Sequence, residues 1–470
     1  MQRQWCWSGC AGLAVAWSLL AAGCAVGPNF QRPTMEMPAA WTGEPAGTEA
    51  RVADQELRRW WEGFNDPQLT SLIERAMAAN LDLRQAAARV RQARAARGVA
   101  FAAIGPTLDA SAGHERSRTT AGVVGDLYQA GFDAGWEIDL FGGTRRGIEA
   151  AEADLTAAVE EQNGVLVSLS AEVARNYITL RVGQQRLAMA RQTLTAQRKT
   201  AELTRQRYEA GLVNRLDRSN AEAQLATTAA QVPVLESAVR QTMHTLAVLL
   251  GQPPATLVAE LTPDAPVPVA VTPVPAGLPS DLLRRRPDIR KAEAALHAAT
   301  ARIGVATADL FPRFTLSGAL SFSDTHLGSL FTWAERGWSF GPSVSWRLFE
   351  SGRTLANIEL RKAMQEEEGL AYQQTVLTAL REVEDALVAA AKEEEHRRAL
   401  LGATIANRKV VELAIRLYQA GETDFLAVVV AQRALYAAED ALAQGTGTAA
   451  IELVALYKAL GGGWGQERKL

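Results

Sequence analysis

The sequence contains an internal duplication, which limits the chain to a fold built from two similar halves. Residues 82–86 (DLRQA) recur as 288–292 (DIRKA), and 208–211 (YEAG) recur as 418–421 (YQAG), an offset of about 206 to 210 residues. A period this long does not fit a stack of short solenoid repeats. Each copy instead predicts one structural half: a helix, two strands, a very long helix, a tight turn and a returning helix.

The duplication and a linker rich in Pro and Val set the expected organisation. We expect a signal peptide at 1–23, a lipidated N-terminal segment at 24–66, a first repeat at 67–250, the linker at 251–279, a second repeat at 280–461 and a tail at 462–470. Within the repeats, strand pairs are expected at about 106–140 and 312–348, and long helix pairs at about 143–250 and 352–460. The linker composition predicts an extended, semi-rigid connection.

The N-terminus has the pattern of a cleaved bacterial export signal. Arg3 precedes an apolar run at 11–20, which is too short to span a bilayer core of about 30 Å. The small residues 21–23 before Cys24 resemble a lipobox, so we expect Cys24 to become the lipidated first residue. The alternative is an ordinary secretory signal with an incidental cysteine. The other two cysteines leave with the signal, which excludes a disulfide framework.

Three stretches alternate apolar residues with small or polar ones, at 128–140, 314–322 and 338–348, and a weaker one follows Pro106. Strict alternation over about ten residues, with aromatic residues near the ends, is typical of a barrel strand between lipid and water. A half-buried sheet in a soluble domain has the same period. No stretch after the signal has 18 consecutive apolar residues, so a chain of this sequence would have to cross a membrane with strands.

Four strands per chain cannot close a barrel, and an open strand edge is untenable in hydrocarbon. Three chains would contribute twelve strands, an even number within the range of known outer-membrane barrels. The strands therefore predict an oligomer. With three chains, the predicted fold class is a mixed α/β membrane protein: a homotrimer with a 12-stranded β-barrel and long α-helices.

Long helices are predicted from about Gly143 to Ala210 and from about Arg353 to Gln419. The first stretch has no proline, and a helix of roughly 65 residues would be on the order of 100 Å long. Apolar or small residues recur along it at intervals of seven, which is typical of a coiled-coil seam. A pair of long helices in a soluble bundle is the alternative.

The long helices are each expected to end at a turn, at Gly211 and Gly421, because glycine suits the left-handed position after a helix. The polar residues that follow are Asn214, Asp217, Glu422 and Asp424. Helix capping and favourable charge at helix N-termini account for them. In a trimer, the three acids would also form rings at a tunnel mouth, where they would favour cations.

Four longer motifs occur in order over nearly the whole mature chain. They are CAVGPNF at 24–30, WWEGFNDPQL at 60–69, LPSDLL at 278–283 with RPDIR at 286–290, and LYKALGGGW at 456–464. Together they resemble the TolC-like outer-membrane efflux family, in the lipoprotein (NodT-type) branch that serves resistance–nodulation–division pumps.

The resemblance implies a lipid-anchored homotrimeric exit duct in the bacterial outer membrane, with a helical coiled-coil barrel that extends into the periplasm. A periplasmic adaptor protein would dock at the turns, formed by Gly211, Leu212, Val213 and Gly421. An inner-membrane proton-driven transporter would feed the adaptor. No cofactor is implied.

Residue 430 departs from the family pattern. The family usually carries an Asp within a Leu-Asp-Ala-Gln stretch that forms a constricting ring, whereas residues 428–432 read VVVAQ here. Val430 stands at the Asp position. Either three valines narrow the tunnel, or Val430 faces a neighbouring helix.

Other classes of function find little support. The five histidines have no metal-ligand spacing, and the glycines at 461–463 lack the Lys-Ser/Thr of a phosphate loop, so we expect no metal site and no catalytic residue. A formal charge of −3 gives no reason to expect nucleic-acid binding. Two alternatives stay open: an outer-membrane duct for ATP-driven protein secretion, and a non-conducting structural lipoprotein that spans the envelope.

Overall fold

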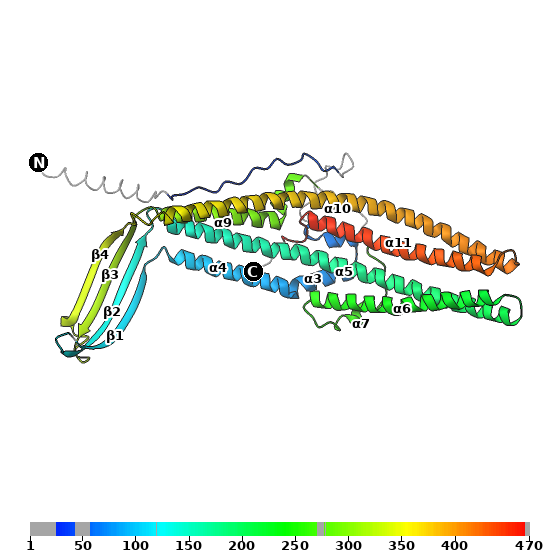
Figure 1. Ribbon diagram of the computed structural model, residues 1–470, viewed down its shortest axis with the longest axis horizontal. Helices are drawn as coiled ribbons and strands as arrows, with labels where there is room; N and C mark the ends of the chain where they lie inside the picture. Colours follow the sequence, from blue (N-terminus) through cyan, green and yellow to red (C-terminus); the bar gives the residue numbers. More distant parts are fainter. Residues whose placement is uncertain (1–24, 43–56, 119, 270–276, 278, 466–470) are drawn as a thin grey trace. The chain divides into compact units, whose positions relative to one another are not determined.

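The structure is a computed structural model that describes residues 25–42, 57–118, 120–269, 277 and 279–465. The predicted signal peptide and Cys24 lie outside the described residues. The chain forms two compact units, shown with their secondary structure in Figure 1: unit 1 (Met1–Met35, Ala88–Val159, Lys291–Gln374) and unit 2 (Glu36–Ala87, Glu160–Arg290, Thr375–Leu470).

Unit 1 contains a four-stranded antiparallel sheet in the order β1-β2-β3-β4 (Figure 1). The strands are β1 (Thr107–Arg118), β2 (Val124–Ile138), β3 (Arg313–Asp324) and β4 (Arg336–Ser345). β1 and β4 are the edge strands, so within the described chain each has one edge without a partner strand.

The register separates the two faces of the sheet as the alternation predicts. Phe132 lies opposite Leu320, which lies opposite Trp338, and all three share the apolar face. The other face carries small and polar residues, such as Gly131 opposite Ser321. One face therefore suits lipid and the other suits water.

The ends of two strands differ from the sequence prediction. β2 was expected at 128–140 but ends at Ile138, because the Asp139 carboxylate accepts a hydrogen bond from the Arg145 backbone N–H at 2.9 Å near the start of α5. β4 was expected at 338–348 but ends at Ser345, and the Trp346 indole donates to the Leu310 carbonyl at 3.0 Å. The residues after Ile138 and Ser345 therefore no longer pair with a neighbouring strand and instead contact the segments that connect the sheet to the helices.

The helices dominate the rest of the chain. The longer ones are α3 (Pro67–Ala79), α4 (Leu81–Ala102), α5 (Gly143–Glu209), α6 (Arg215–Leu249), α9 (Pro287–Ala308), α10 (Arg353–Ala420) and α11 (Phe425–Ala459). The short ones are η1 (Trp60–Phe64), α7 (Val258–Leu261), η2 (Pro279–Asp281), α8 (Leu282–Arg285) and η3 (Trp333–Glu335). None of the helices in the described part of the chain is long and apolar enough to cross a membrane.

The two predicted long helices are confirmed. α5 has 67 residues and α10 has 68, so each is on the order of 100 Å long. In the predicted seam of α5, Val173 and Leu180 are fully buried. A Cβ atom added at Gly183 would lie 3.0 Å from a methyl of Val239 in α6, which shows why a small residue occurs there.

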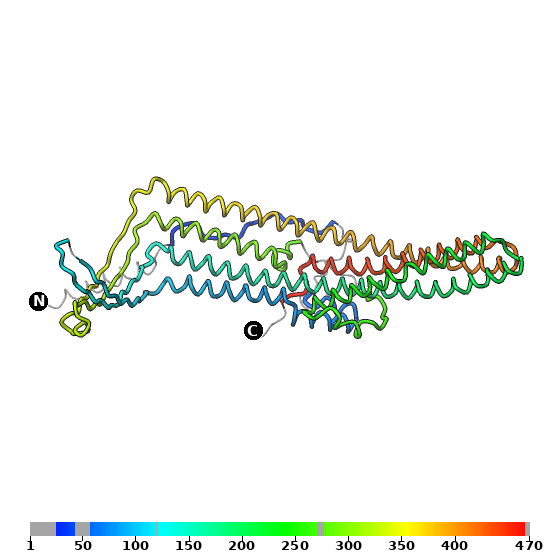
Figure 2. The backbone as a smooth tube through the Cα atoms, turned by 60° about the horizontal axis from the view of Figure 1, so that its bottom comes forward, coloured from blue at the N-terminus to red at the C-terminus, as the bar shows by residue number. Residues whose placement is uncertain are grey.

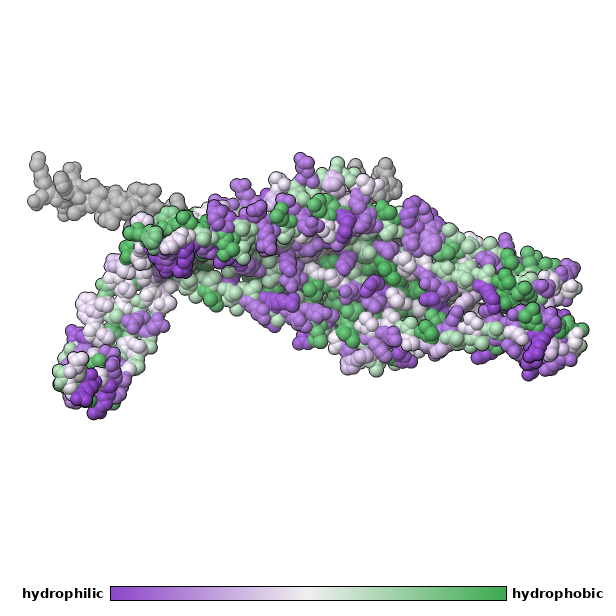
Figure 3. Space-filling view, in the orientation of Figure 1, coloured by the Kyte–Doolittle hydropathy of each residue, from purple (hydrophilic) through white to green (hydrophobic). Residues whose placement is uncertain are grey.

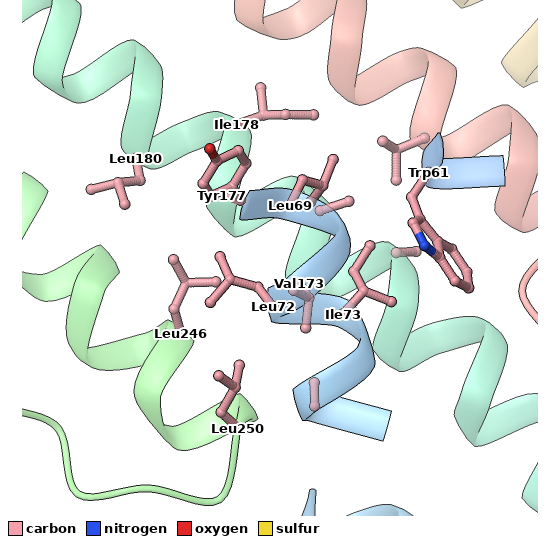
Figure 4. Packing of buried hydrophobic residues seen from close by; sticks show 14 of the residues in the cluster. Trp61, Leu69, Leu72, Ile73, Val173, Tyr177, Ile178, Leu180, Leu246 and Leu250 are labelled. Atoms are coloured by element: carbon pink, nitrogen blue, oxygen red, sulfur yellow. The ribbon is translucent and has the colours of Figure 1, made fainter. Parts of the chain in front are cut away.

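The largest hydrophobic core lies in unit 2 and joins η1, α3, α5 and α6 (Figure 4). Trp61, Leu72 and Ile73 face Tyr177 and Leu246 across it, and all are fully buried. The linker at 251–279 was expected to be extended throughout, but it contains α7. Its apolar residues Leu257 and Leu261 are drawn into this core, and their burial explains the local helix.

The two most specific motifs meet in unit 2. The Arg286 guanidinium donates to the Ala459 carbonyl at 2.9 Å and pairs with Asp288 and Glu382 at 2.6 and 2.7 Å. Arg290 lies over the Trp464 ring at 5.0 Å. RPDIR and LYKALGGGW thus form one contact that fastens the end of the second repeat to its beginning.

In unit 1, residues 25–32 form a strap along the helices. Gly27 has φ +91°, and a Cβ there would lie 2.4 Å from the Gly304 Cα in α9. The buried Arg146 side chain donates to the Val26 carbonyl at 3.2 Å and to the Asn29 side chain at 2.6 Å. The strap is therefore held directly after the predicted lipidation position.

Candidate functional site

The turn between α5 and α6 and the turn between α10 and α11 lie side by side in unit 2 (Figure 2). In the first, the Leu212 N–H donates to the Arg207 carbonyl at 2.8 Å and the Gly211 N–H donates to the Tyr208 carbonyl at 2.9 Å. This pair of bonds is a Schellman motif, which satisfies the last carbonyls of the helix.

The second turn repeats the motif one repeat later. The Glu422 N–H donates to the Leu417 carbonyl at 2.9 Å and the Gly421 N–H donates to the Tyr418 carbonyl at 3.1 Å. Gly211 and Gly421 have φ of +74° and +78°, as expected for the left-handed position. The duplication is thus preserved down to the hydrogen bonds of the turns.

The returning helices are capped as the sequence predicts. The Asn214 side chain accepts from the Asp217 N–H at 2.9 Å, and the Asp424 carboxylate accepts from the Ala427 N–H at 3.0 Å. Asp217 lies in the first turn of α6, where its charge favours the helix N-terminus. Glu422 caps no helix: it is exposed, and its backbone completes the Schellman motif.

A groove of about 520 Å³ runs between the two turns. It brings together Gly211, Leu212, Val213, Gly421 and the acids Asp217 and Asp424. Glu422 does not line it. The structure therefore brings two of the three predicted acids into one site and places the third on the outer surface of the turn.

Beneath the groove lies a small core that fixes the spacing of the turns. Phe425 and Val428 of α11 are buried there with Ala221 of α6. The Tyr418 ring packs at 5.5 Å from Phe425, and the Arg207 guanidinium lies over Tyr418 at 4.8 Å. A cation held over an aromatic face stabilises both partners.

These arginine–tyrosine contacts were not predicted from the sequence. Arg218 lies over the Tyr208 ring at 5.6 Å and pairs with Glu222 at 2.8 Å, and the hydrogen bond with Glu222 raises the pKa of Arg218. The duplication aligns Tyr208 with Tyr418, and a guanidinium lies over each of these two equivalent tyrosines. The alignment of the two tyrosines was the sequence signal that could have pointed to these contacts. The arginines themselves are not aligned by the duplication, since Arg207 lies in α5 and Arg218 in α6.

Val430 differs from its neighbours in exposure. Val428 and Val429 are 2% and 3% exposed in the core beneath the groove, whereas Val430 is 56% exposed. Within its own chain, therefore, Val430 points away from the helices that bury the other two valines. Leu212, Leu216 and Leu426 are also exposed near the turns.

Among the described residues, no group of three or more His, Cys, Asp or Glu side chains is arranged to hold a metal ion. The acids of the turns act in the structure as helix caps and surface charges.

Comparison with known proteins identifies the family to which this chain belongs. The family model described as "Outer membrane efflux protein" matches residues 72–252 and again 278–462, one match for each half of the duplication. The chain belongs to the outer membrane efflux protein family.

Relatives in the outer membrane efflux protein family match the chain over nearly its full length. Nodulation protein T of Rhizobium leguminosarum bv. trifolii is 34% identical over 95% of this chain and 96% of its own. The toluene efflux pump outer membrane protein TtgF of Pseudomonas putida is 34% identical over 96% of each chain. The solved structure of the outer-membrane channel OprN is 38% identical in sequence and superposes with a TM-score of 0.87. The match covers 94% of this chain and 100% of the OprN chain. The predicted family and its TolC-like fold class are therefore confirmed.

The helix cap beside the second turn of this efflux protein can be tested by mutation. Asp424→Ala removes the cap of α11, a loss of about 1 kcal/mol. We expect amide hydrogen exchange in the first two turns of α11 to rise about fivefold, because local opening becomes that much more frequent. Glu422→Ala, which removes a carboxylate two residues before Asp424 that caps no helix, is the matched control. Equal exchange in the two variants would show that Asp424 does not cap the helix in solution.

Proposed function

We propose that this chain forms the outer-membrane exit channel of a tripartite efflux pump, through which substrates pass passively and without catalysis. The observation that carries this proposal is a sheet with one apolar and one polar face, joined to two helices of 67 and 68 residues, in a member of the outer membrane efflux protein family. The sheet suits a membrane with water on one side, and the helices are long enough for a tunnel across the periplasm.

The functional unit is a homotrimer. Each chain leaves one edge of β1 and one edge of β4 without a partner strand among the described residues, and neither edge can stay open in hydrocarbon. β1 and β4 run in opposite directions at the two edges, so β1 of one copy can pair antiparallel with β4 of the next. Three copies then give twelve strands. α10 also carries exposed apolar residues that suit burial between copies, namely Leu355, Leu360, Leu370 and Leu377.

The groove between the turns is the docking site for the periplasmic adaptor. Exposed Leu212 and half-buried Val213 supply apolar contact area, and Asp217 and Asp424 supply charge at the same surface. The Schellman motifs and the buried Phe425 hold the two turns rigid, which lowers the entropic cost of docking. An inner-membrane proton-driven transporter feeds the adaptor.

Val430 forms the resting constriction of the tunnel. Its side chain is 56% exposed on the chain, so in a trimer three copies are available to narrow the lumen. A narrow apolar ring sheds water and resists ions without binding them. Asp217, Glu422 and Asp424 lie nearer the turns and form the acidic mouth.

Cys24 carries the lipid that anchors the channel to the outer membrane. The docked strap supports this role, because Val26 donates its N–H to the Phe141 carbonyl at 3.0 Å, next to the end of β2. Val26, two residues after the proposed lipid-bearing cysteine, is thus held where the sheet meets the helices.

The lipid assignment is tested by labelling. Cys24→Ser should abolish incorporation of labelled fatty acid, since serine offers no thiol for the thioether bond. The sheet inserts independently, so trimers should still form. Unchanged labelling of the variant contradicts the assignment.

The trimer is tested by charging the apolar face of the sheet. Leu320→Lys should destabilise the inserted state by about 2–4 kcal/mol per chain, because the side chain lies mid-strand on the predicted lipid face. The matched control is Ser317→Thr on the opposite face of the same strand, which should have little effect. Mass measurement in detergent reports the state: a stable wild-type monomer would falsify the trimer.

The constriction is tested in planar bilayers. Wild type should conduct little at rest and be blocked weakly by a trivalent cation. Val430→Asp should raise conductance and strengthen block, because three carboxylates repel one another, wet the ring and bind the cation. Val429→Asp is the control, since Val429 is buried and its replacement should cost stability instead. If wild type is already strongly blocked and Val430→Asp changes neither property, Val430 is not the constriction.

A further inference from the structure

The turn end of the sheet carries basic residues on an otherwise apolar face. The helices join the sheet at the start of β1 and β3 and at the end of β2 and β4, so the turn end is the opposite one. It holds the last residues of β1, His114, Arg116 and Arg118, and the first residue of β4, Arg336. Hydrophilic residues gather there in the space-filling view (Figure 3).

The register shows which way these side chains project. His114 lies opposite Tyr128, Arg116 opposite Asp126 and Arg118 opposite Val124. Tyr128 shares the face of Phe132, Leu320 and Trp338, because residues two apart on a strand lie on one face. Arg336 lies opposite Phe322 on the same face. All four basic residues are therefore on the face that the proposed function assigns to lipid.

Their depth matches the head-group level. Trp136 and Tyr128 mark the two ends of the apolar stretch of β2 and lie eight residues apart, or about 27 Å along an extended strand. At the strand tilt of about 35–45° in outer-membrane barrels, this corresponds to about 20 Å along the membrane normal, a little less than the apolar band of about 25 Å that aromatic residues border. Arg116 and Arg118 come beyond Tyr128, just outside the band.

The neighbouring acids on this face, Asp126 and Asp324, offset only two of the three arginine charges of this patch. Asp126 pairs with His114 at 3.0 Å and with Arg116 at 3.5 Å, yet the Arg116 side chain stays 68% exposed. Asp324 is turned into its own loop, where it accepts from the His326 N–H at 3.1 Å. Arg336 lies over the Trp333 ring at 4.1 Å, which holds the guanidinium at an aromatic surface.

Arg118 and Arg336 lie on opposite edges of the sheet in one chain. Arg118 ends β1 and Arg336 begins β4, and both are at the turn end. Pairing β1 of one copy with β4 of the next brings them to the same seam. The cationic patch is therefore completed only by a second copy of the chain.

We propose that each seam binds a bisphosphorylated glycolipid of the outer leaflet, with Arg116 and Arg118 of one copy and Arg336 of the next holding its phosphates. Guanidinium groups bind phosphate with two parallel hydrogen bonds, and Trp333 and Trp338 offer apolar surface to the acyl chains. This proposal rests on the proposed function, which sets the seam and the orientation of the sheet.

The test uses the full-length trimer, purified in detergent and mixed with defined lipids, with bound lipid counted by native mass spectrometry. The variant is Arg116→Gln/Arg118→Gln/Arg336→Gln. The matched control is Arg313→Gln/Arg347→Gln, which removes arginines from the helix end of the same sheet. The probes are bisphosphorylated lipid A, its dephosphorylated form and phosphatidylglycerol.

We expect wild type and the control to retain one lipid A per seam, and the variant to lose at least tenfold in affinity, since each arginine near the head groups contributes about fivefold. Dephosphorylated lipid A should bind as weakly to wild type as lipid A does to the variant. Equal retention by wild type and variant, or equal retention of phosphatidylglycerol, overturns the proposal.

The same sample separates this proposal from the proposed function. A trimer that forms the expected weakly conducting channel in planar bilayers but retains no lipid A overturns the glycolipid site alone. A chain that forms no trimer overturns the seam, and with it both proposals.

Discussion

The architecture of this protein depends on two strand edges whose backbone groups cannot remain unpaired in hydrocarbon. Water is absent from a bilayer core, so the free N–H and carbonyl groups along the outer edges of β1 and β4 need a partner. The described part of one chain supplies four strands. In the proposed trimer, the requirement for closure makes each copy dependent on the others, and it sets both the lumen and the seams between copies.

Much of the fold follows from the sequence because its signals are local and repeated. Alternation identified the sheet faces, and the absence of proline from 143 to 210 identified α5. The linker was predicted less well. Its prolines indicate an extended chain, but Leu257 and Leu261 are buried in a core assembled from α3, α5 and α6, and that tertiary burial outweighs local preference. No local pattern reports such a contact.

The features of the candidate site likewise fall into those that the sequence predicts and those that it does not. Gly211, Gly421, Asn214 and Asp424 are readable from sequence, because capping depends on residues three or four apart. The placement of Arg207 over Tyr418 is not, since it joins the two repeats across the turn region. The exposure of Val430 beside two buried valines also depends on which face of α11 packs on α6 and α10, and three identical residues in a row carry no phase information.

The strap of residues 25–32 bears on the order in which the chain matures. Gly27 packs on Gly304, and Arg32 pairs with Glu293, which lies 261 residues further along the chain. The earliest described segment to be synthesised thus completes its docking only after α9 has been made. A chain that stops before the second repeat keeps the contacts of Val26 and Asn29 with Arg146 but lacks those of Gly27 and Arg32 with α9. A fully seated strap therefore marks a chain whose synthesis has passed α9.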